Sequence, residues 1–266
     1  MSRWIGSVFL LVILAGCSSG PRQFQPVDPI APDRVSHETW DRIVRAHVRD
    51  GQVDYPAIET DGRLEGYLQE LNRINPTRLP TSQDRLAFWI NAYNGFAVQG
   101  ILDHYSPKTL WGRYRYFIGR DYLVGGTTIN LYDLEREVLI EQFHEPLMHF
   151  AIVCASRSCP KLQSWAYQPE QLDRQLGQVA RDFINDPTRN RFDRTQKVAS
   201  LSMIFRWFEK DFSDAAGSVL AYIARYVDDP ELAKELTHSG YRIEYPDYDW
   251  SLNGVAPKEI GHAGRS

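Results

Sequence analysis

Two of the three cysteines of this chain lie five residues apart, at the end of a predicted strand. Residues 149–154 (HFAIVC) form a short β-branched and aromatic run, which predicts a buried strand. The next four residues, ASRS, have the small polar composition of a loop, and Pro160 ends that loop. Thiols are strong nucleophiles, and loops at strand ends often carry chemistry. Cys154 and Cys159 therefore make this segment the first candidate for a functional site.

The N-terminus resembles the signal of a bacterial lipoprotein. An apolar run at residues 8–14 is too short to span a bilayer as an ordinary helix, and it leads into LAGC, which is similar to a lipobox ending at Cys17. The alternative is a plain secretory signal that is cut elsewhere. Ser18 after the cysteine resembles lipoproteins sorted to the outer membrane of Gram-negative cells. We therefore expect a signal peptide over 1–16, lipidation with palmitate at Cys17, and an anchor on the periplasmic face of the outer membrane.

Composition divides the rest of the chain into three parts. Residues 17–34 are rich in proline and poor in apolar side chains, which predicts a lipidated flexible tether. Residues 35–254 are uniformly mixed and are predicted to form a single globular domain, followed by a tail over 255–266. The net charge is −4 and the chain has no basic stripe, which argues against a nucleic-acid partner.

The two inner cysteines allow two opposite interpretations. With Cys17 lipidated, Cys154 and Cys159 are the remaining thiols, and both face an oxidising compartment. Their separation across a turn can bring the two Cα atoms within bridging distance, and we lean slightly towards a disulfide. A disulfide would remove both thiols from catalysis. A catalytic thiol would instead need a lowered pKa, for which Arg157 is a candidate cation.

The strongest helix prediction covers residues 82–104. A cap at Ser82 or the preceding threonine begins it, and apolar residues repeat along it at helical spacing on more than one face. A helix of this kind is buried nearly all round. Asn91 and Asn94 lie within it, three residues apart, and buried amides must hydrogen-bond to specific partners. A structural network and a role in a site both fit these two amides.

The remaining segments predict helices and strands that cluster separately, which indicates an α+β fold. Helices are predicted at 38–48, 64–75, 131–143, 169–183, 203–212 and 219–227. β structure is predicted at 52–56, at 114–130 around the Gly125-Gly126 turn, at 198–201, at 241–245 and at 248–252.

Several motifs resemble the DUF547 family, a domain of unknown function. They are FWINAYNG (88–95), the GG hairpin followed by INLYDLE, HFAIVCASRSCP with KLQSWAY, LSMIFRWFEKDF and the terminal YDWSLN. They occur in the family's order and cover about residues 80–253. The family is grouped by distant fold similarity with papain-like and transglutaminase-like proteins. The resemblance therefore implies an antiparallel sheet packed by several helices, and it raises the expectation of a thiol site.

The chain departs from the family pattern at one position. Many members have a sequence similar to (L/I)xDIEH where this chain has Leu134-Glu135-Arg136, so Arg136 replaces a histidine. If that histidine is the general base of the family, His149 becomes the nearest substitute in this sequence. On one strand, an odd offset places His149 and Cys154 on opposite faces, although Cys159 is not so constrained. His104 is a further candidate.

Two functions remain in view. We expect a membrane-anchored periplasmic lipoprotein that binds a ligand or partner in a cleft near the two inner cysteines. The alternative is a thiol-dependent hydrolase or transferase acting on a peptide or amide substrate in the cell envelope.

A metal site around His144 lacks any HExxH or CxxC pattern, so we expect neither a metal nor a cofactor. Expected partners are the membrane, through the lipid, and an envelope protein or small molecule. The catalytic candidates are Cys154, Cys159, His149 and Asn91, and the binding candidates are Asn94, Ser156, Arg157 and Ser158.

Overall fold

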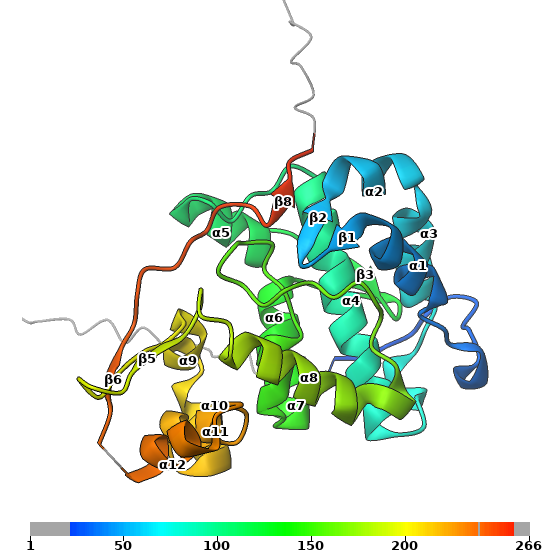
Figure 1. Ribbon diagram of the computed structural model, residues 1–266. Coiled ribbons are helices and arrows are strands. Elements are labelled where there is room, and N and C mark those ends of the chain that lie inside the picture. Colours follow the sequence, from blue (N-terminus) through cyan, green and yellow to red (C-terminus); the bar gives the residue numbers. More distant parts are fainter. Residues whose placement is uncertain (1–21, 239, 258–266) are drawn as a thin grey trace, which may run out of the picture.

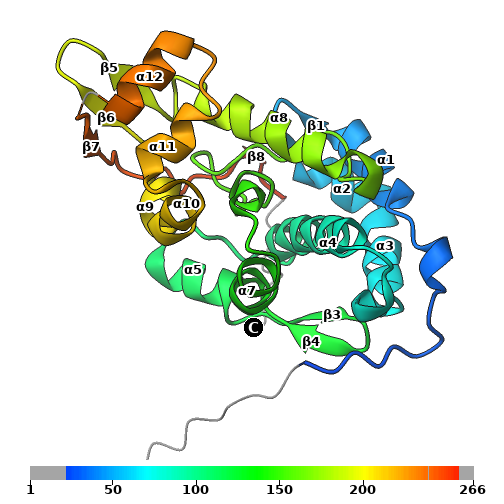
Figure 2. The ribbon, with the colours of Figure 1, turned by 90° about the horizontal axis from the view of Figure 1, so that it is seen from below.

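A long buried helix, α4 (Ser82–Leu102), passes through the interior and is surrounded by the other elements (Figures 1 and 2). Thr81 caps its first turn, because the Thr81 hydroxyl accepts from the Asp84 N–H and the Asp84 carboxylate accepts from the Thr81 N–H. Nearly every residue after the first turn is buried, on all faces of the helix. The prediction of a helix buried nearly all round is confirmed.

The computed structural model describes residues 22–238 and 240–257. The predicted signal peptide over 1–16, Cys17 and most of the predicted tail lie outside the described residues. Over the described ranges the chain is 53% helical and 11% strand, which agrees with the predicted α+β class. No helix within these ranges is long and apolar enough to cross a bilayer.

The described part of the predicted tether lies along the domain. The Arg22 guanidinium donates to the Glu137 carboxylate over 2.9 Å and to the Thr128 carbonyl over 2.6 Å. The Phe24 ring packs against Trp89, with ring centroids 5.7 Å apart. The chain then passes through a short 3-10 turn, η1 (Pro32–Arg34), into the first helix.

Small helices and a three-stranded sheet cover one side of α4 (Figure 1). In this sheet the second strand pairs antiparallel with the first and parallel with the last strand of the chain. The chain therefore brings its C-terminal segment back beside its N-terminal part. The elements are α1 (Glu38–His47), β1 (Val48–Arg49), β2 (Gln52–Asp54), α2 (Tyr55–Asp61), α3 (Arg63–Asn72), η2 (Pro76–Arg78) and β8 (Gly254–Val255).

The predicted β structure over 114–130 is only partly correct. Its first part is a helix, α5 (Leu110–Phe117), whose first turn is capped by the Thr109 hydroxyl. The aromatic composition favoured a strand, but no strand partner covers this surface segment and the cap starts a helix instead. The hairpin itself is present as β3 (Tyr122–Val124) and β4 (Thr127–Ile129), with both turn glycines at positive φ.

A continuous helix follows, as predicted for 131–143, but its middle is π-helical. It comprises α6 (Leu131–Asp133), the π segment η3 (Leu134–Ile140) and α7 (Glu141–Phe143). The Asn130 side chain caps it by accepting from the Asp133 N–H. Because π segments widen the helix and often occur at functional sites, η3 indicates a candidate functional region.

The strand predicted over 149–154 is wrong. A 3-10 helix, η4 (Pro146–Phe150), occupies its start, and irregular chain follows to the thiol. The Asn94 amide explains why no strand partner is needed. Its NH2 donates to the Ala151 carbonyl over 3.0 Å, and its oxygen accepts from the Val153 N–H over 3.0 Å.

The C-terminal half contains a helix that starts at a proline, a helical group and a second three-stranded sheet. The second sheet again contains one antiparallel and one parallel pair, so the expected antiparallel sheet is replaced by small separate sheets, two of them mixed. The elements are η5 (Pro169–Gln171), α8 (Leu172–Ile184), β5 (Arg191–Asp193), β6 (Val198–Ser200), α9 (Met203–Trp207), α10 (Glu209–Ala216), α11 (Val219–Ala224), α12 (Pro230–His238) and β7 (Arg242–Glu244).

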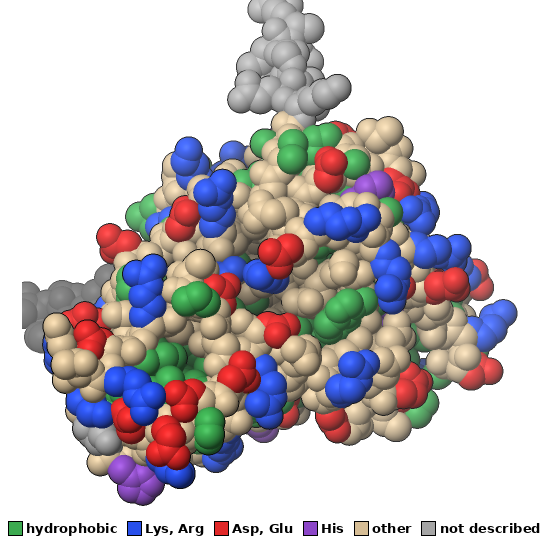
Figure 3. Space-filling view, viewed as in Figure 1, with side chains coloured by type: hydrophobic (Ala, Val, Ile, Leu, Met, Phe, Trp, Pro, Cys, Tyr) green, Lys and Arg blue, Asp and Glu red, His purple; other side chains and the backbone are tan. Residues whose placement is uncertain are grey.

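After β7 the chain crosses the molecule to reach β8 (Figure 1). Residues 248–252 are irregular, so the strand predicted there is wrong, apart from a single bridge between Ser156 and Leu252. On the face shown in Figure 3, charged side chains of both signs are interspersed.

Candidate thiol site

Cys154 and Cys159 are both free thiols, so the disulfide towards which the spacing leaned is absent. Cys154 is half-buried and Cys159 is buried. The Cys159 sulfur accepts a hydrogen bond from the Cys154 N–H over 2.8 Å. The turn therefore directs the second sulfur at the backbone of the first cysteine, and Cys154 is the more accessible of the two thiols.

The turn after Cys154 is conformationally strained. Ala155 adopts a left-handed conformation with φ of 57°, which is unfavourable for an L-residue with a Cβ. The C-terminal segment holds it there, because the Asn253 N–H donates to the Ala155 carbonyl over 3.1 Å. The Arg157 N–H donates to the Ser251 carbonyl over 2.8 Å. The YDWSLN motif thus fixes the turn that presents the Cys154 thiol.

Hydroxyl groups surround the Cys154 sulfur. The Ser156 Oγ lies 3.0 Å from it and the Tyr248 hydroxyl lies 3.2 Å from it. Burial alone would raise the pKa of Cys154. Hydrogen bonds from Cys159, Ser156 and Tyr248 and from the Ser156 N–H outweigh burial and lower this pKa to about 7. Burial raises the pKa of Cys159 instead. Cys154 is therefore the thiol that ionises near neutral pH.

A cavity of about 310 Å³ opens beside Cys154. Its walls are mostly aromatic and aliphatic, with a smaller number of polar and charged groups, as is typical of small-molecule sites. Its lining residues are Tyr93, Arg113, Phe117, Tyr132, Glu135, Arg136, His149, Ile152, Val153, Cys154, Cys159, Pro160, Ile204, Trp207, Phe208, Tyr248 and Trp250.

Glu135, from the π segment η3, brings a carboxyl group to this cavity. Burial raises the pKa of Glu135 to about 7, although the Arg136 charge and a hydrogen bond from the Tyr93 hydroxyl, 3.4 Å away, oppose the rise. The cavity therefore holds a thiol and a carboxyl group whose pKa values have been shifted towards neutrality from opposite sides. Such pairs mark acid–base sites.

His149 also lines the cavity, from the 3-10 helix η4. Its Nε2 bonds the Asp211 carboxylate over 2.8 Å, its ring stacks on Phe208, and its Nδ1 is buried without a hydrogen-bond partner among the described residues. Burial lowers the pKa of His149 despite the Asp211 charge, so the ring is neutral at pH 7. It makes no hydrogen bond with Cys154 among those described. The other histidine candidate, His104, is absent from the lining of this cavity.

The two helix asparagines have structural partners. The Asn91 amide donates to the Tyr167 carbonyl over 2.8 Å and accepts from the Tyr167 N–H over 2.9 Å. Asn94 makes the same pair of contacts with residues 151–153, the segment that leads into Cys154. Neither amide lines the thiol cavity. Asn94 is therefore a positioning residue for the thiol segment, and Asn91 clamps a more distant loop.

Arg157 and Ser158 lie on the far side of the turn from the cavity. Arg157 is exposed, and both residues line a separate surface depression with Asp249. The Ser158 N–H donates to the Asp249 carbonyl over 3.2 Å, and its hydroxyl accepts from the Asp249 N–H over 2.9 Å. The expectation that Arg157 supplies the charge for the thiolate is therefore replaced by the hydroxyl and N–H donors around Cys154.

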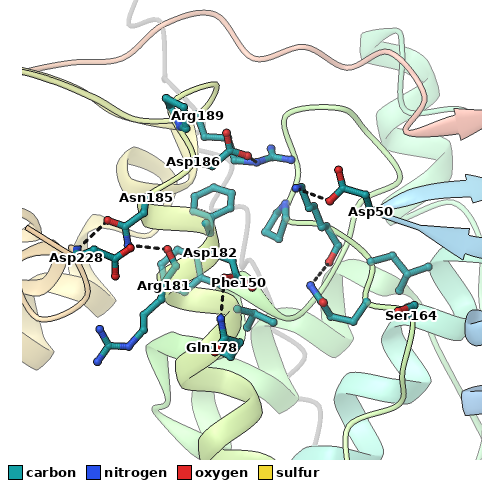
Figure 4. Close-up of a pocket in the computed structure, with 18 residues that line it drawn as sticks. Asp50, Phe150, Ser164, Gln178, Arg181, Asp182, Asn185, Asp186, Arg189 and Asp228 are labelled. Carbon is teal, nitrogen blue, oxygen red and sulfur yellow. Dashed lines mark hydrogen bonds and ion pairs between the residues drawn. The ribbon is translucent and has the colours of Figure 1, made fainter.

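A larger cavity, of about 600 Å³, lies between the 160–164 loop and helix α8 (Figure 4). Many of its polar groups are already paired. Lys161 binds Asp50 over 2.7 Å, and Gln178 donates to Asp182 over 2.8 Å. This cavity contains neither thiol. The smaller cavity, in which the reactive groups meet, is the better candidate for chemistry.

The sequence did not reveal Tyr248, which contacts the thiol, or Tyr93 and Glu135, which line the same cavity. All three come from segments far from Cys154 in the sequence, and only the fold brings them together. The sequence did contain one signal for Glu135, because Glu135 and Arg136 lie where the family motif carries DIEH. Among the described residues, no group of three or more His, Cys, Asp or Glu side chains could hold a metal ion.

Comparison with known proteins gives one match. Residues 76–184 match the family described as "Protein of unknown function, DUF547", which supports the resemblance seen in the sequence motifs. No curated protein and no solved structure matches the chain. The matched segment contains α4, Glu135, both inner cysteines and α8.

Proposed function

We propose that this protein is a thiol-dependent hydrolase or transferase, in which Cys154 attacks the carbonyl carbon of a peptide or amide substrate. The observation that carries the proposal is the free Cys154 thiol, held on a strained turn between two hydroxyl groups and facing a cavity that also contains Glu135. The free thiols and the carboxyl group of Glu135 support this activity over the ligand-binding function expected from the sequence.

The chemistry follows from the two shifted groups. The Cys154 thiolate forms a C–S bond to the substrate carbonyl, and the C–N bond then breaks as protonated Glu135 gives its proton to the leaving amine. The carboxylate that remains takes a proton from water, or from an acceptor amine or hydroxyl. That nucleophile attacks the thioester, the C–S bond breaks, and Cys154 leaves as the thiolate.

An activated ester tests this cycle without knowledge of the natural substrate. p-Nitrophenyl acetate should release one equivalent of nitrophenolate in a burst, and mass spectrometry should find the acetyl group on Cys154. Cys154→Ala should abolish the burst, whereas Cys159→Ala should slow the burst without removing it, because Cys159 helps to lower the Cys154 pKa. Glu135→Gln should keep the burst and slow the later turnover, and Glu137→Gln, its exposed neighbour, is the matched control. Acetylation that is spread over several nucleophiles would contradict the proposal.

A second candidate is ligand binding without chemistry, which is supported by the aromatic walls of the cavity. Trp207, Tyr248 and Trp250 form a contiguous group with ring centroids 4.6–5.8 Å apart. Such a surface can stack on a flat apolar group. An envelope lipoprotein that captured a ligand here would show saturable quenching of tryptophan fluorescence and no acyl intermediate on Cys154.

We also propose that lipid on Cys17 holds the protein at the outer membrane, on the strength of the lipobox-like sequence. Cys17→Ala should release the protein from sedimented membranes. A mature N-terminus other than residue 17 would contradict the proposal. As part of the thiol-chemistry proposal, we also propose a distant fold relationship to papain-like or transglutaminase-like proteins.

A further inference from the structure

Two arginines line the thiol cavity without an acidic partner. Arg113 comes from α5 and Arg136 from the π segment η3, and neither makes an ion pair with any residue within 22–238 and 240–257. Arg113 is half-buried and Arg136 is exposed, and both line the cavity that contains Cys154. Arg113 donates one hydrogen bond, to the Pro107 carbonyl over 3.5 Å, and the remaining guanidinium donors of the two arginines are left for water or a ligand.

Aromatic rings hold both guanidinium groups in place. The Arg113 Cζ lies 4.6 Å from the centre of the Trp250 ring, and the Arg136 Cζ lies 5.2 Å from the centre of the Phe208 ring. The Trp250 ring in turn contacts Tyr248, whose hydroxyl lies 3.2 Å from the Cys154 sulfur. A stacked guanidinium keeps its N–H edge free for an anion while its face is covered.

The charge balance of the cavity favours an anion. The acidic groups in its lining are Glu135 and the two thiols, and burial keeps Glu135 partly protonated near neutral pH. Asp211 keeps its negative charge, since the His149 ring that it bonds is neutral, but it does not line this cavity. Against these stand two permanent positive charges, so the cavity attracts a negative ligand group at pH 7.

We infer that the substrate of Cys154 carries a carboxylate, or a similar anionic group, which Arg113 and Arg136 bind while the aromatic walls hold its apolar part. This inference rests on the proposed thiol chemistry and names the class of its substrate: an acidic acyl donor, such as a peptide with a free carboxylate near the bond that Cys154 attacks. Bidentate binding by a guanidinium would orient the carbonyl towards the thiolate.

Two alkylating reagents of the same size test the inference, because one is an anion and the other is neutral. The rate of Cys154 alkylation by iodoacetate is divided by the rate with iodoacetamide, which corrects for thiol ionisation. The same ratio is measured for a cysteine in a short peptide. The folded protein should exceed the peptide ratio by about fivefold or more at low salt, and the excess should shrink as salt screens the charges.

Substitutions then assign the effect to the two side chains. Arg113→Gln and Arg136→Gln should each lower the ratio by about twofold or more. Arg115→Gln is the matched control, since Arg115 lies on the same helix, carries the same charge and stacks on Tyr105 away from the cavity. An equal loss in the control, or a ratio equal to that of the peptide, would overturn the inference. Slow reaction with both reagents would instead overturn the proposed thiol chemistry.

Discussion

Replacing Tyr248 with phenylalanine tests how the fold activates the Cys154 thiol. The change removes one hydroxyl, 3.2 Å from the sulfur, and keeps the ring that packs on Trp207 and Trp250. A hydrogen bond to a charged group contributes about 1.5–3 kcal/mol, and one pKa unit corresponds to about 1.4 kcal/mol. The Cys154 pKa should therefore rise by about one to two units from its value of about 7.

The thiolate fraction at pH 7 then falls from about one half to about a tenth or less. The alkylation rate with iodoacetamide should fall by about fivefold or more at pH 7, yet match that of the unmodified protein at pH 10, where Cys154 is ionised in both proteins. The assay is peptide-resolved mass spectrometry across a pH series. Tyr245→Phe is the control, since Tyr245 lies in the same segment but outside the thiol cavity. Identical pH profiles for the two variants would refute the account of how the thiolate is stabilised.

Two further predictions concern the groups around the thiol. Asn91→Leu and Asn94→Leu should each lower the free energy of unfolding by about 3 kcal/mol in urea titrations, because each leaves two buried backbone groups unpaired. Only Asn94→Leu should also slow Cys154 alkylation, and an equal effect of both would argue against a positioning role for Asn94. Glu135 has a folded pKa of about 7, above its unfolded value, so the stability that it contributes is fully present below about pH 4.5 and is lost as the pH rises through 7. Glu135→Gln should therefore raise the free energy of unfolding by about 3 kcal/mol at pH 8 and leave it nearly unchanged at pH 4, and a constant difference between the two would disprove the shift.

The sequence predicted correctly those elements that depend on interactions between residues near each other in the chain. The capped apolar helix over 82–104 and the hairpin at Gly125-Gly126 depend on neighbouring residues, and both are present. The strand predicted over 149–154 failed because its hydrogen bonds go to a side chain, Asn94, which lies far away in the sequence. Composition alone cannot reveal such a partner.

The residues of the thiol site also fall into those that the sequence revealed and those that only the fold reveals. Cys154, Ser156 and the two asparagines were recognisable, since unusual residue types stand out in a single sequence. Tyr248 was not, because it is one of many tyrosines and becomes a partner only when the C-terminal segment returns to the turn. The redox state was also open from spacing alone, because the direction of the Cys159 side chain depends on the strained turn at Ala155.

If Cys17 carries lipid as proposed, the short segment between it and the domain limits how far the domain can stand from the membrane. Arg22 is bonded to Glu137, two residues from Glu135 in the wall of the thiol cavity. Between Cys17 and Arg22 the chain spans about 18 Å at most, even when fully extended. With lipid on Cys17, the wall of the cavity formed by the π segment would therefore be held close to the bilayer surface. A substrate that is itself attached to the envelope would meet the thiol at high local concentration, whereas a large soluble protein would have little room to approach.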